Sequence, residues 1–139
     1  LTLASMIERE GKPEDFTKIS AVFHNRLKAK MALGSDVTVQ YILKTSKLTL
    51  SDGDIAVSSP YNTYKIKGLP LGPISNPGQK AIHAALYPDE QYVKAKYLYF
   101  VLTDPATGML EFNKTLAAHE KAVKKYRPLW EAYDKEHNK

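Results

Sequence analysis

Apolar residues recur at helical spacing in three stretches of the chain, and each stretch predicts an amphipathic helix. The first helix covers residues 1–10, and Gly11 ends it because glycine tolerates the left-handed backbone conformation. The second covers residues 13–34, from a proline to a glycine. The third covers residues 115–135 and should bend at Pro128. Its expected core-facing side chains are Leu116, Ala117, Ala122, Val123, Tyr126, Leu129, Trp130 and Tyr133.

Shorter helices are predicted between these stretches. One follows the potential caps Ser35 and Asp36 and covers residues 37–43. Residues 48–57 predict one or two helical turns, because a serine and an aspartate three residues apart there fit a capping box. Another helix should open at Asn76-Pro77, with the asparagine as its cap, and stop at Pro88.

Aromatic and branched residues dominate residues 97–103, which predicts a β-strand. Turn-forming residues follow, and residues 109–113 return as a second strand, so the pair reads as a β-hairpin. A lone hairpin is marginally stable, and this one must therefore pack on the helices or pair with another strand.

Residues 59–78 follow neither the helical nor the strand period. They hold four prolines and three glycines, which favours a long loop. Several tyrosine, leucine and isoleucine side chains in it offer apolar surface to bury, so the loop should be ordered. Two interpretations stay open: one wall of a binding cleft, or a packing strap over the helices.

These elements predict an α+β fold. We expect a single, mainly helical domain over residues 1–139, with a small β-hairpin and a long ordered loop rich in proline and glycine.

Composition narrows the function classes. The chain of 139 residues carries a net charge of +5, which suits an anionic partner, but the basic residues form no dense patch and no nucleic-acid motif. No cysteine is present, so disulfides and thiol chemistry are excluded. The four histidines lack metal-ligand spacing, and no apolar run is long enough to span a membrane. We therefore expect no metal and no cofactor.

Two carboxylates near the end of the first helix are candidate proton donors. A helical wheel places Glu10 close to Leu3 and Met6, and Glu8 at the edge of the apolar sector. A carboxyl group in apolar surroundings has a raised pKa, which suits a general acid. The alternative is a frayed last turn with both groups in water. Residues 55–88 contain no acid, so the long loop cannot supply one.

Several motifs together resemble one known family. In chain order they are LASMIERE, AVFHNRL, LGSDVTVQY, SPYNTY, GLPLGPISNPG, YLYFV and the pair His119-Glu120. The order and the residues of these motifs resemble those of the endolytic murein transglycosylases of the YceG-like family, from residue 1 to about residue 127. The departures are small: Met6 stands where isoleucine is frequent and Leu71 where proline is frequent.

The resemblance implies an enzyme that cleaves peptidoglycan glycan strands between N-acetylmuramic acid and N-acetylglucosamine and leaves 1,6-anhydro ends. It also implies a cleft distantly like that of lysozymes. A membrane anchor and a LysM-like subdomain would precede this catalytic domain, which would face outside the cytoplasmic membrane. The partners would be glycan strands and cell-wall synthases, with no nucleic acid and with membrane contact only through the anchor.

The resemblance also implies roles for particular residues. The family's catalytic glutamate is the first of its motif, which falls on Glu8, whereas the helical wheel favours Glu10 as the more buried carboxylate. The resemblance takes precedence over the wheel, so Glu8 is the expected catalytic residue. Asp36 either positions a sugar hydroxyl or caps its helix, and its cap preference favours the second role. The expected substrate contacts are Tyr61, Asn62, Thr63, Tyr64, Gln40 and Asn25, each with a structural hydrogen bond as the alternative.

Two other function classes compete with catalysis. One is a non-catalytic glycan-binding module that tethers a synthase complex to the cell wall. The other is a nucleic-acid-binding domain, suggested only by the positive charge.

Overall fold

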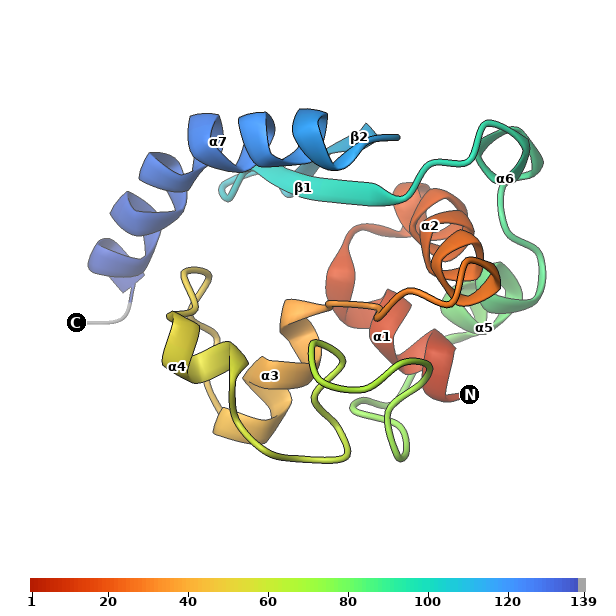
Figure 1. Cartoon of the computed structure of the whole chain (residues 1–139), viewed down its shortest axis with the longest axis horizontal. Helices are drawn as coiled ribbons and strands as arrows, with labels where there is room; N and C mark the ends of the chain where they lie inside the picture. The colour runs from red at the N-terminus through yellow and green to blue at the C-terminus, as the bar shows by residue number, and fades with distance from the viewer. Residues whose placement is uncertain (138–139) are drawn as a thin grey trace.

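The computed structural model of the protein describes residues 1–137. Helices α1 (Thr2–Glu10), α2 (Phe16–Lys28) and α5 (Gln79–Leu86) lie together on one side of the molecule (Figure 1). A short 3-10 turn, η1 (Pro13–Asp15), leads into α2, and α6 (Glu90–Lys94) packs against α2. Helices α3 (Asp36–Leu43) and α4 (Asp52–Ile55) form the lower part of the view.

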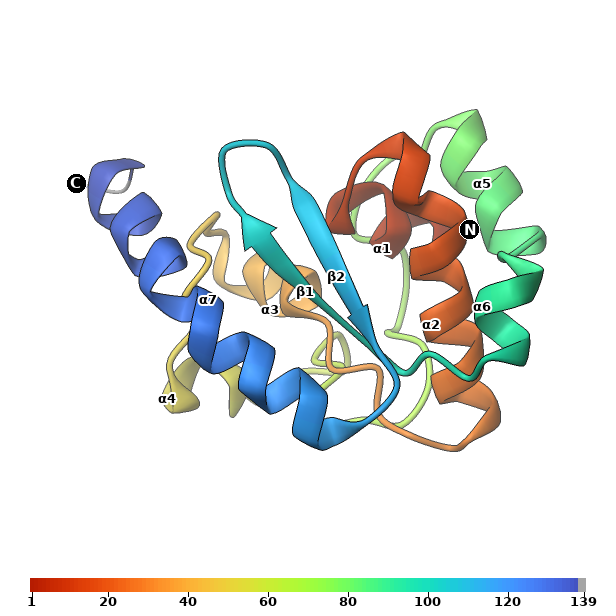
Figure 2. The ribbon, with the colours of Figure 1, turned by 90° about the horizontal axis from the view of Figure 1, so that it is seen from above.

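Strands β1 (Tyr99–Asp104) and β2 (Met109–Asn113) form an antiparallel hairpin, as predicted. Phe100 lies opposite Phe112 and Leu102 opposite Leu110, and a register irregularity follows Leu102. Both phenylalanines pack on the hydrophobic core made by α1 and α2. Helix α7 (Leu116–His137) packs mainly against β1, and the view from above shows it running beside the hairpin (Figure 2).

The core centres on α1 and α2. Met6, Ile7 and Ile19 are fully buried there, together with Phe23 at the middle of α2. The apolar sector predicted for the first helix is therefore confirmed, because Leu3, Met6 and Ile7 all join this cluster. The α+β class and the mainly helical content are confirmed as well.

Helix α1 ends at Glu10 with Gly11 as its C-cap, as predicted, but the reason given for Gly11 is wrong. Gly11 has extended backbone (φ −164°), and its lack of a side chain matters because a Cβ would come within 2.7 Å of Ile19 Cδ1. Two other local predictions are wrong. The second helix ends at Lys28, well before Gly34. Helix α5 begins after Gly78 and not at Asn76-Pro77, and it has no side-chain cap of its own.

Helix α7 is less buried than its sequence pattern suggests. Ala122 is buried, but Leu116 and Leu129 are more than half exposed. Pro128 lies inside the helix, and Figure 1 shows α7 bent partway along its length, as predicted. The second half is held from beyond the hairpin: Asp134 accepts hydrogen bonds from the backbone N–H groups of Leu48 (2.9 Å) and Thr49 (2.8 Å).

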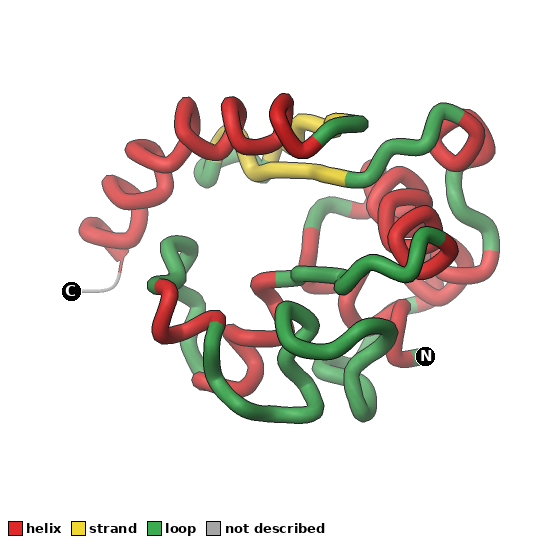
Figure 3. The backbone as a smooth tube through the Cα atoms, in the orientation of Figure 1, coloured by secondary structure: helices red, strands yellow, loops and turns green. Residues whose placement is uncertain are grey.

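Residues 59–78 form a long loop without helix or strand, as predicted (Figure 3). Ser5 of α1 fixes it at two points, since its hydroxyl accepts a hydrogen bond from Ile74 N (3.0 Å) and its carbonyl accepts one from Ser75 Oγ (2.9 Å). Ile74 is buried in the core. The loop therefore packs as a strap over α1, which was one of the two interpretations of its sequence.

Candidate active site

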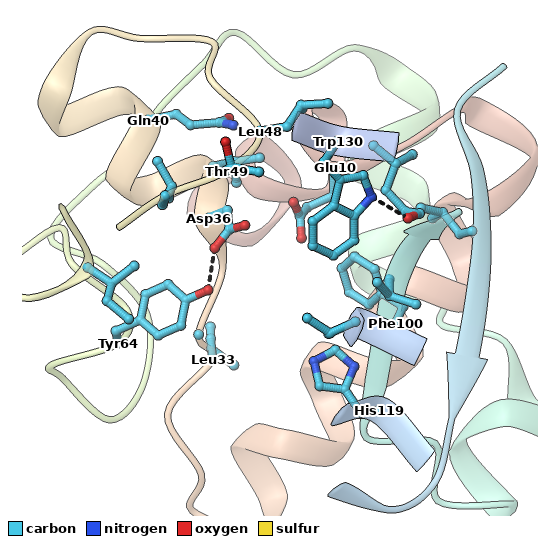
Figure 4. Close-up of a pocket in the computed structure, with 18 of the residues that line it drawn as sticks. Glu10, Leu33, Asp36, Gln40, Leu48, Thr49, Tyr64, Phe100, His119 and Trp130 are labelled. Carbon is cyan, nitrogen blue, oxygen red and sulfur yellow. Dashed lines mark hydrogen bonds between the residues drawn. The ribbon is translucent and has the colours of Figure 1, made fainter. Parts of the chain in front are cut away.

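A cavity of about 480 Å³ lies between the hairpin, α7 and the lower helices. Its walls come from the end of α1, the middle of α2, the start of α3, the segment of residues 48–55 and the inner face of α7. Figure 4 shows Glu10 near its centre, with Asp36 and Tyr64 toward one side of the view and Trp130 and His119 toward the other. Residues that are far apart in the sequence thus surround the carboxyl group of Glu10.

Glu10 has a strongly raised pKa. Burial, reinforced by the nearby negative charge of Asp36, raises the pKa of Glu10 to about 8. Ser35 and Arg26 act in the opposite direction and favour the charged form. The side chain is therefore protonated near neutral pH, and it lines the cavity.

Glu8 lies outside the lining of this cavity. Its Oε1 accepts a hydrogen bond from Gly78 N at 2.7 Å, and Gly78 is the residue that precedes α5. A carboxylate at a helix N-terminus satisfies a free backbone N–H group and interacts favourably with the helix dipole. Glu8 thus supplies from α1 the cap that α5 lacks. Its catalytic role stays a prediction from the resemblance.

Asp36 occupies the first turn of α3, but its side chain makes no capping hydrogen bond. Its carboxylate instead accepts a hydrogen bond from the Tyr64 hydroxyl inside the cavity (Figure 4). Burial raises the pKa of Asp36, and the hydrogen bond from Tyr64 partly offsets that effect. The capping role favoured by sequence is wrong, and the side chain is placed to contact a ligand.

The SPYNTY segment divides its side chains between the interior and the cavities. Asn62 is fully buried, and its amide nitrogen donates to the carbonyls of Ile55 (3.0 Å) and Val57 (2.7 Å). Its side-chain oxygen accepts a hydrogen bond from Tyr64 N (3.0 Å). Asn62 therefore fixes the backbone that carries Tyr64, which lines the cavity.

Thr63 and Asn25 are also interior residues. The Thr63 hydroxyl accepts a hydrogen bond from Ser35 N (2.8 Å) and pairs with the Thr38 hydroxyl (2.9 Å). Asn25 donates to the carbonyls of Tyr92 and Tyr97. For these residues, as for Asn62, the placement supports the structural alternative that the sequence left open and not direct contact with a substrate.

Gln40 and Tyr61 are closer to solvent. Gln40 lines the cavity while its amide donates to Lys47 O (3.0 Å). Tyr61 does not line the cavity around Glu10 but an adjoining one, where its ring lies 5.2 Å from that of Tyr41. Of the predicted substrate contacts, Tyr64, Asp36 and Gln40 thus surround the site of Glu10.

Arg26 of α2 also lines the cavity. Its guanidinium donates to the carbonyls of Leu98 (2.6 Å), Ala32 (2.9 Å) and Leu33 (3.2 Å). It also lies over the Tyr99 ring at 4.8 Å. These contacts fix a positive charge in the wall beside Glu10.

His119 is the second functional candidate that the sequence underrated. Its ring stacks on Tyr99 (centroids 4.9 Å apart) and lines the cavity. The buried Nδ1 has no hydrogen-bond partner in the part of the chain that the structure describes. Burial, together with the charge of Arg26, lowers the pKa of His119, so the ring is neutral near pH 7.

No cluster of three or more histidine, aspartate or glutamate side chains suited to a metal ion occurs within residues 1–137. Across the same residues, no helix has the length and apolar character needed to cross a bilayer.

Comparison with known proteins identifies the family. The profile of the YceG-like family matches residues 1–125. The chain belongs to the YceG-like family. A protein of Bacillus subtilis (strain 168) named endolytic murein transglycosylase is 46% identical over 127 residues, which cover 91% of this chain and 34% of that protein. The protein of the same name from Streptococcus pneumoniae (strain D39) is 34% identical over 129 residues, covering 88% of this chain and 22% of the relative.

A solved YceG-like relative supports the same fold. The crystal structure of a yceG-like protein from Listeria monocytogenes superposes with a TM-score of 0.76 at 45% identity, over 86% of this chain and 38% of that one. The chain thus spans about a third of the Bacillus and Listeria relatives and about a fifth of the pneumococcal one.

One stability prediction follows from the SPYNTY segment. Asn62→Ala leaves two buried carbonyls without their donor, so we expect the free energy of unfolding in urea to fall by about 2–4 kcal/mol. Asn76 lies exposed in the same loop. Asn76→Ala should change the free energy of unfolding by less than about 0.5 kcal/mol. Equal losses in the two variants would contradict the structural role of Asn62.

Proposed function

We propose that this domain cleaves the glycan strands of murein by lytic transglycosylation, with Glu10 as the proton donor. The observation that carries the proposal is a partly buried carboxyl group with a pKa of about 8 in a cavity bordered by polar side chains. The activity in the names of its Bacillus and pneumococcal relatives supports the same conclusion.

In the proposed reaction, the carboxyl group of Glu10 gives its proton to the glycosidic oxygen as the bond from that oxygen to C1 breaks. The positive charge that develops at C1 is then quenched by the C6 oxygen of the same muramic residue. The Glu10 carboxylate accepts the proton of the C6 hydroxyl and returns to its starting form. No water is consumed, and the product carries a 1,6-anhydro ring.

The neighbours of Glu10 have distinct roles in this scheme. Asp36, held by the Tyr64 hydroxyl, offers an acceptor for a sugar hydroxyl. The neutral His119 ring lines the opposite wall and offers a second contact there. Arg26 stabilises the carboxylate that Glu10 becomes after it has given up its proton, because a nearby positive charge favours the ionised form.

Mass spectrometry of digested peptidoglycan tests the proposal. We expect anhydro-muropeptides to accumulate with time, and a protein that binds glycan without releasing them is a binding module. Products with reducing ends would instead mean that water attacks C1, an outcome that the second carboxylate, Asp36, makes worth measuring.

The proposed substrate implies a location. Murein lies outside the cytoplasmic membrane, so we propose that the domain works on the extracytoplasmic side, tethered by a membrane anchor, with cell-wall synthases as partners. Net charge alone supports the nucleic-acid alternative, and the cavity lining favours a carbohydrate.

A further inference from the structure

A second cavity of about 690 Å³ adjoins the one that holds Glu10. Arg9 and Gln40 line both cavities, so the two meet along these side chains. Figure 4 shows Gln40 on α3 beyond Asp36, away from the hairpin wall. A substituent on a sugar bound at Glu10 is therefore within reach of the second cavity.

The chemistry of the second cavity differs from that of the first. The first contains the carboxylates Glu10, Asp36 and Asp52. The lining of the second, in the described part of the chain, contains none. It consists of two cations, several hydroxyl groups, an amide, two tyrosine rings and an isoleucine: Arg9, Lys44, Thr45, Ser46, Ser59, Gln40, Tyr41, Tyr61 and Ile42.

The two cations have no anionic partner in the part of the chain that the structure describes. Arg9 and Lys44 are exposed, and neither forms an ion pair within residues 1–137. Lys44 ends α3 in the left-handed conformation (φ 54°), and its N–H bonds to Gln40 O. A cation there also interacts favourably with the helix C-terminus, so a test must measure ligand binding and not only stability.

The tyrosines give the cavity a ring surface. Tyr41 is 46% exposed, and its ring lies 5.2 Å from that of the more buried Tyr61. Tyr61 and Tyr64 belong to the same SPYNTY segment, but they line different cavities. One rigid segment thus links the site of Glu10 to a cationic, aromatic site beside it.

Building on the proposed function, we propose that the second cavity binds the peptide stem of the murein strand, with a stem carboxylate against Arg9 and Lys44. The glycan backbone itself is uncharged, whereas the stem on each muramic residue carries carboxylates. A strand cleaved at a muramic residue must place that residue's stem next to the reacting bond. The adjoining cavity is lined by positive charges and hydroxyl donors, which are the groups that bind a carboxylate.

Binding measurements can test this inference without turnover. The protein with Glu10→Gln is titrated calorimetrically with a murein tetrasaccharide that carries tetrapeptide stems, and with the same saccharide after the stems have been removed. We expect the stems to lower Kd by about threefold to tenfold, the range expected for two solvent-exposed ion pairs. The difference should shrink at high salt because exposed charges are screened.

The double substitution Arg9→Gln, Lys44→Gln should remove the stem-dependent gain, measured as the ratio of the Kd values for the stem-free and stem-bearing saccharides in the same variant. The ratio is the readout because Arg9 also lines the cavity of Glu10, where the saccharide itself binds. A matched control is Lys65→Gln, Lys67→Gln, which removes two exposed cations from the neighbouring loop and should keep the gain. Retention of the gain in the Arg9, Lys44 variant overturns the inference.

The failure of this inference and that of the proposed function are distinguishable. Equal Kd values for the two saccharides overturn the stem site and leave glycan cleavage at Glu10 intact. Loss of binding to both saccharides argues against the proposed function itself. Competition by a phosphate polymer at the same Arg9 and Lys44, with no effect of the stems, would assign the cavity to another anionic wall component and overturn the inference.

Discussion

Replacing Glu10 by Gln is expected to lower the rate of glycan cleavage by a factor on the order of 10²–10⁴, the usual contribution of a positioned general acid. The substitution keeps the size and shape of the protonated carboxyl group, which is the form present near neutral pH. It removes only the proton that the reaction needs. The release of anhydro-muropeptides, quantified by mass spectrometry, measures the loss.

Glu8→Gln is the matched control, because the residue lies in the same helix and the change is the same. Its carboxylate bonds to Gly78 N at the start of α5 and lies outside the cavity. We therefore expect activity within about threefold of wild type and a small loss of stability, of about 0.5–1.5 kcal/mol, from the weaker cap. The reverse pattern, with Glu8→Gln inactive and Glu10→Gln active, would restore the assignment that the family motif implies.

The periodicity of the first helix predicted more of the site than any other single signal. The helical wheel alone places Glu10 nearest the apolar sector, and this is the carboxylate that the fold buries. The motif position points instead to Glu8, whose partner Gly78 lies 70 residues away in sequence. Such long-range contacts leave no mark on local periodicity.

Arg26 and His119 illustrate the same limit. In the sequence, Arg26 is one of several basic residues near the end of a helix. In the fold, its guanidinium donates to the carbonyl of Leu98, 72 residues later, and the side chain becomes part of a cavity wall. His119 reads as the polar side of α7 until the hairpin brings Tyr99 against its ring. Local propensity predicts helices and turns well, but it carries no information about which faces meet.

Asp36 shows that a correct residue preference for helix N-termini can still lead to a wrong prediction. Asp36 has the residue type, the position and the helix for a capping role. In the fold, Ser35 takes the N-cap position, and the Asp36 side chain turns to Tyr64. Tyr64 belongs to the long loop of residues 59–78. The sequence predicted that this loop is ordered, but it did not predict which of the tyrosine rings in the loop faces the cavity.

The pH dependence of activity should show an alkaline limb that belongs to Glu10. The pKa of this carboxyl group is raised to about 8, so the proton donor is present at pH 7 and disappears above pH 8. We expect kcat/KM for glycan cleavage to fall about tenfold per pH unit beyond that point. Glu8→Gln should keep this limb, because it leaves Glu10 and its neighbours unchanged.

Stability should change with pH through the same group, and the direction follows from proton binding. Between pH 4.5 and about 8, Glu10 holds its proton in the folded protein and has lost it in the unfolded chain. The folded state then binds more protons, so the free energy of unfolding decreases as pH rises, by up to about 1.4 kcal/mol per pH unit. The raised pKa of Asp36 acts in the same direction, and the lowered pKa of His119 acts oppositely but only below pH 6.5.

Urea unfolding of wild type and Glu10→Gln at fixed ionic strength between pH 6.5 and 8.5 measures the effect of Glu10 as the difference between the two proteins. Wild-type protein should lose stability across the lower part of this interval and level off above pH 8, where both states are ionised. Glu10→Gln has no proton to lose, so its stability should stay nearly constant and exceed that of wild type at pH 8. Parallel curves for the two proteins would mean that Glu10 is ionised in the folded state at neutral pH, and the general-acid role would then fall with it.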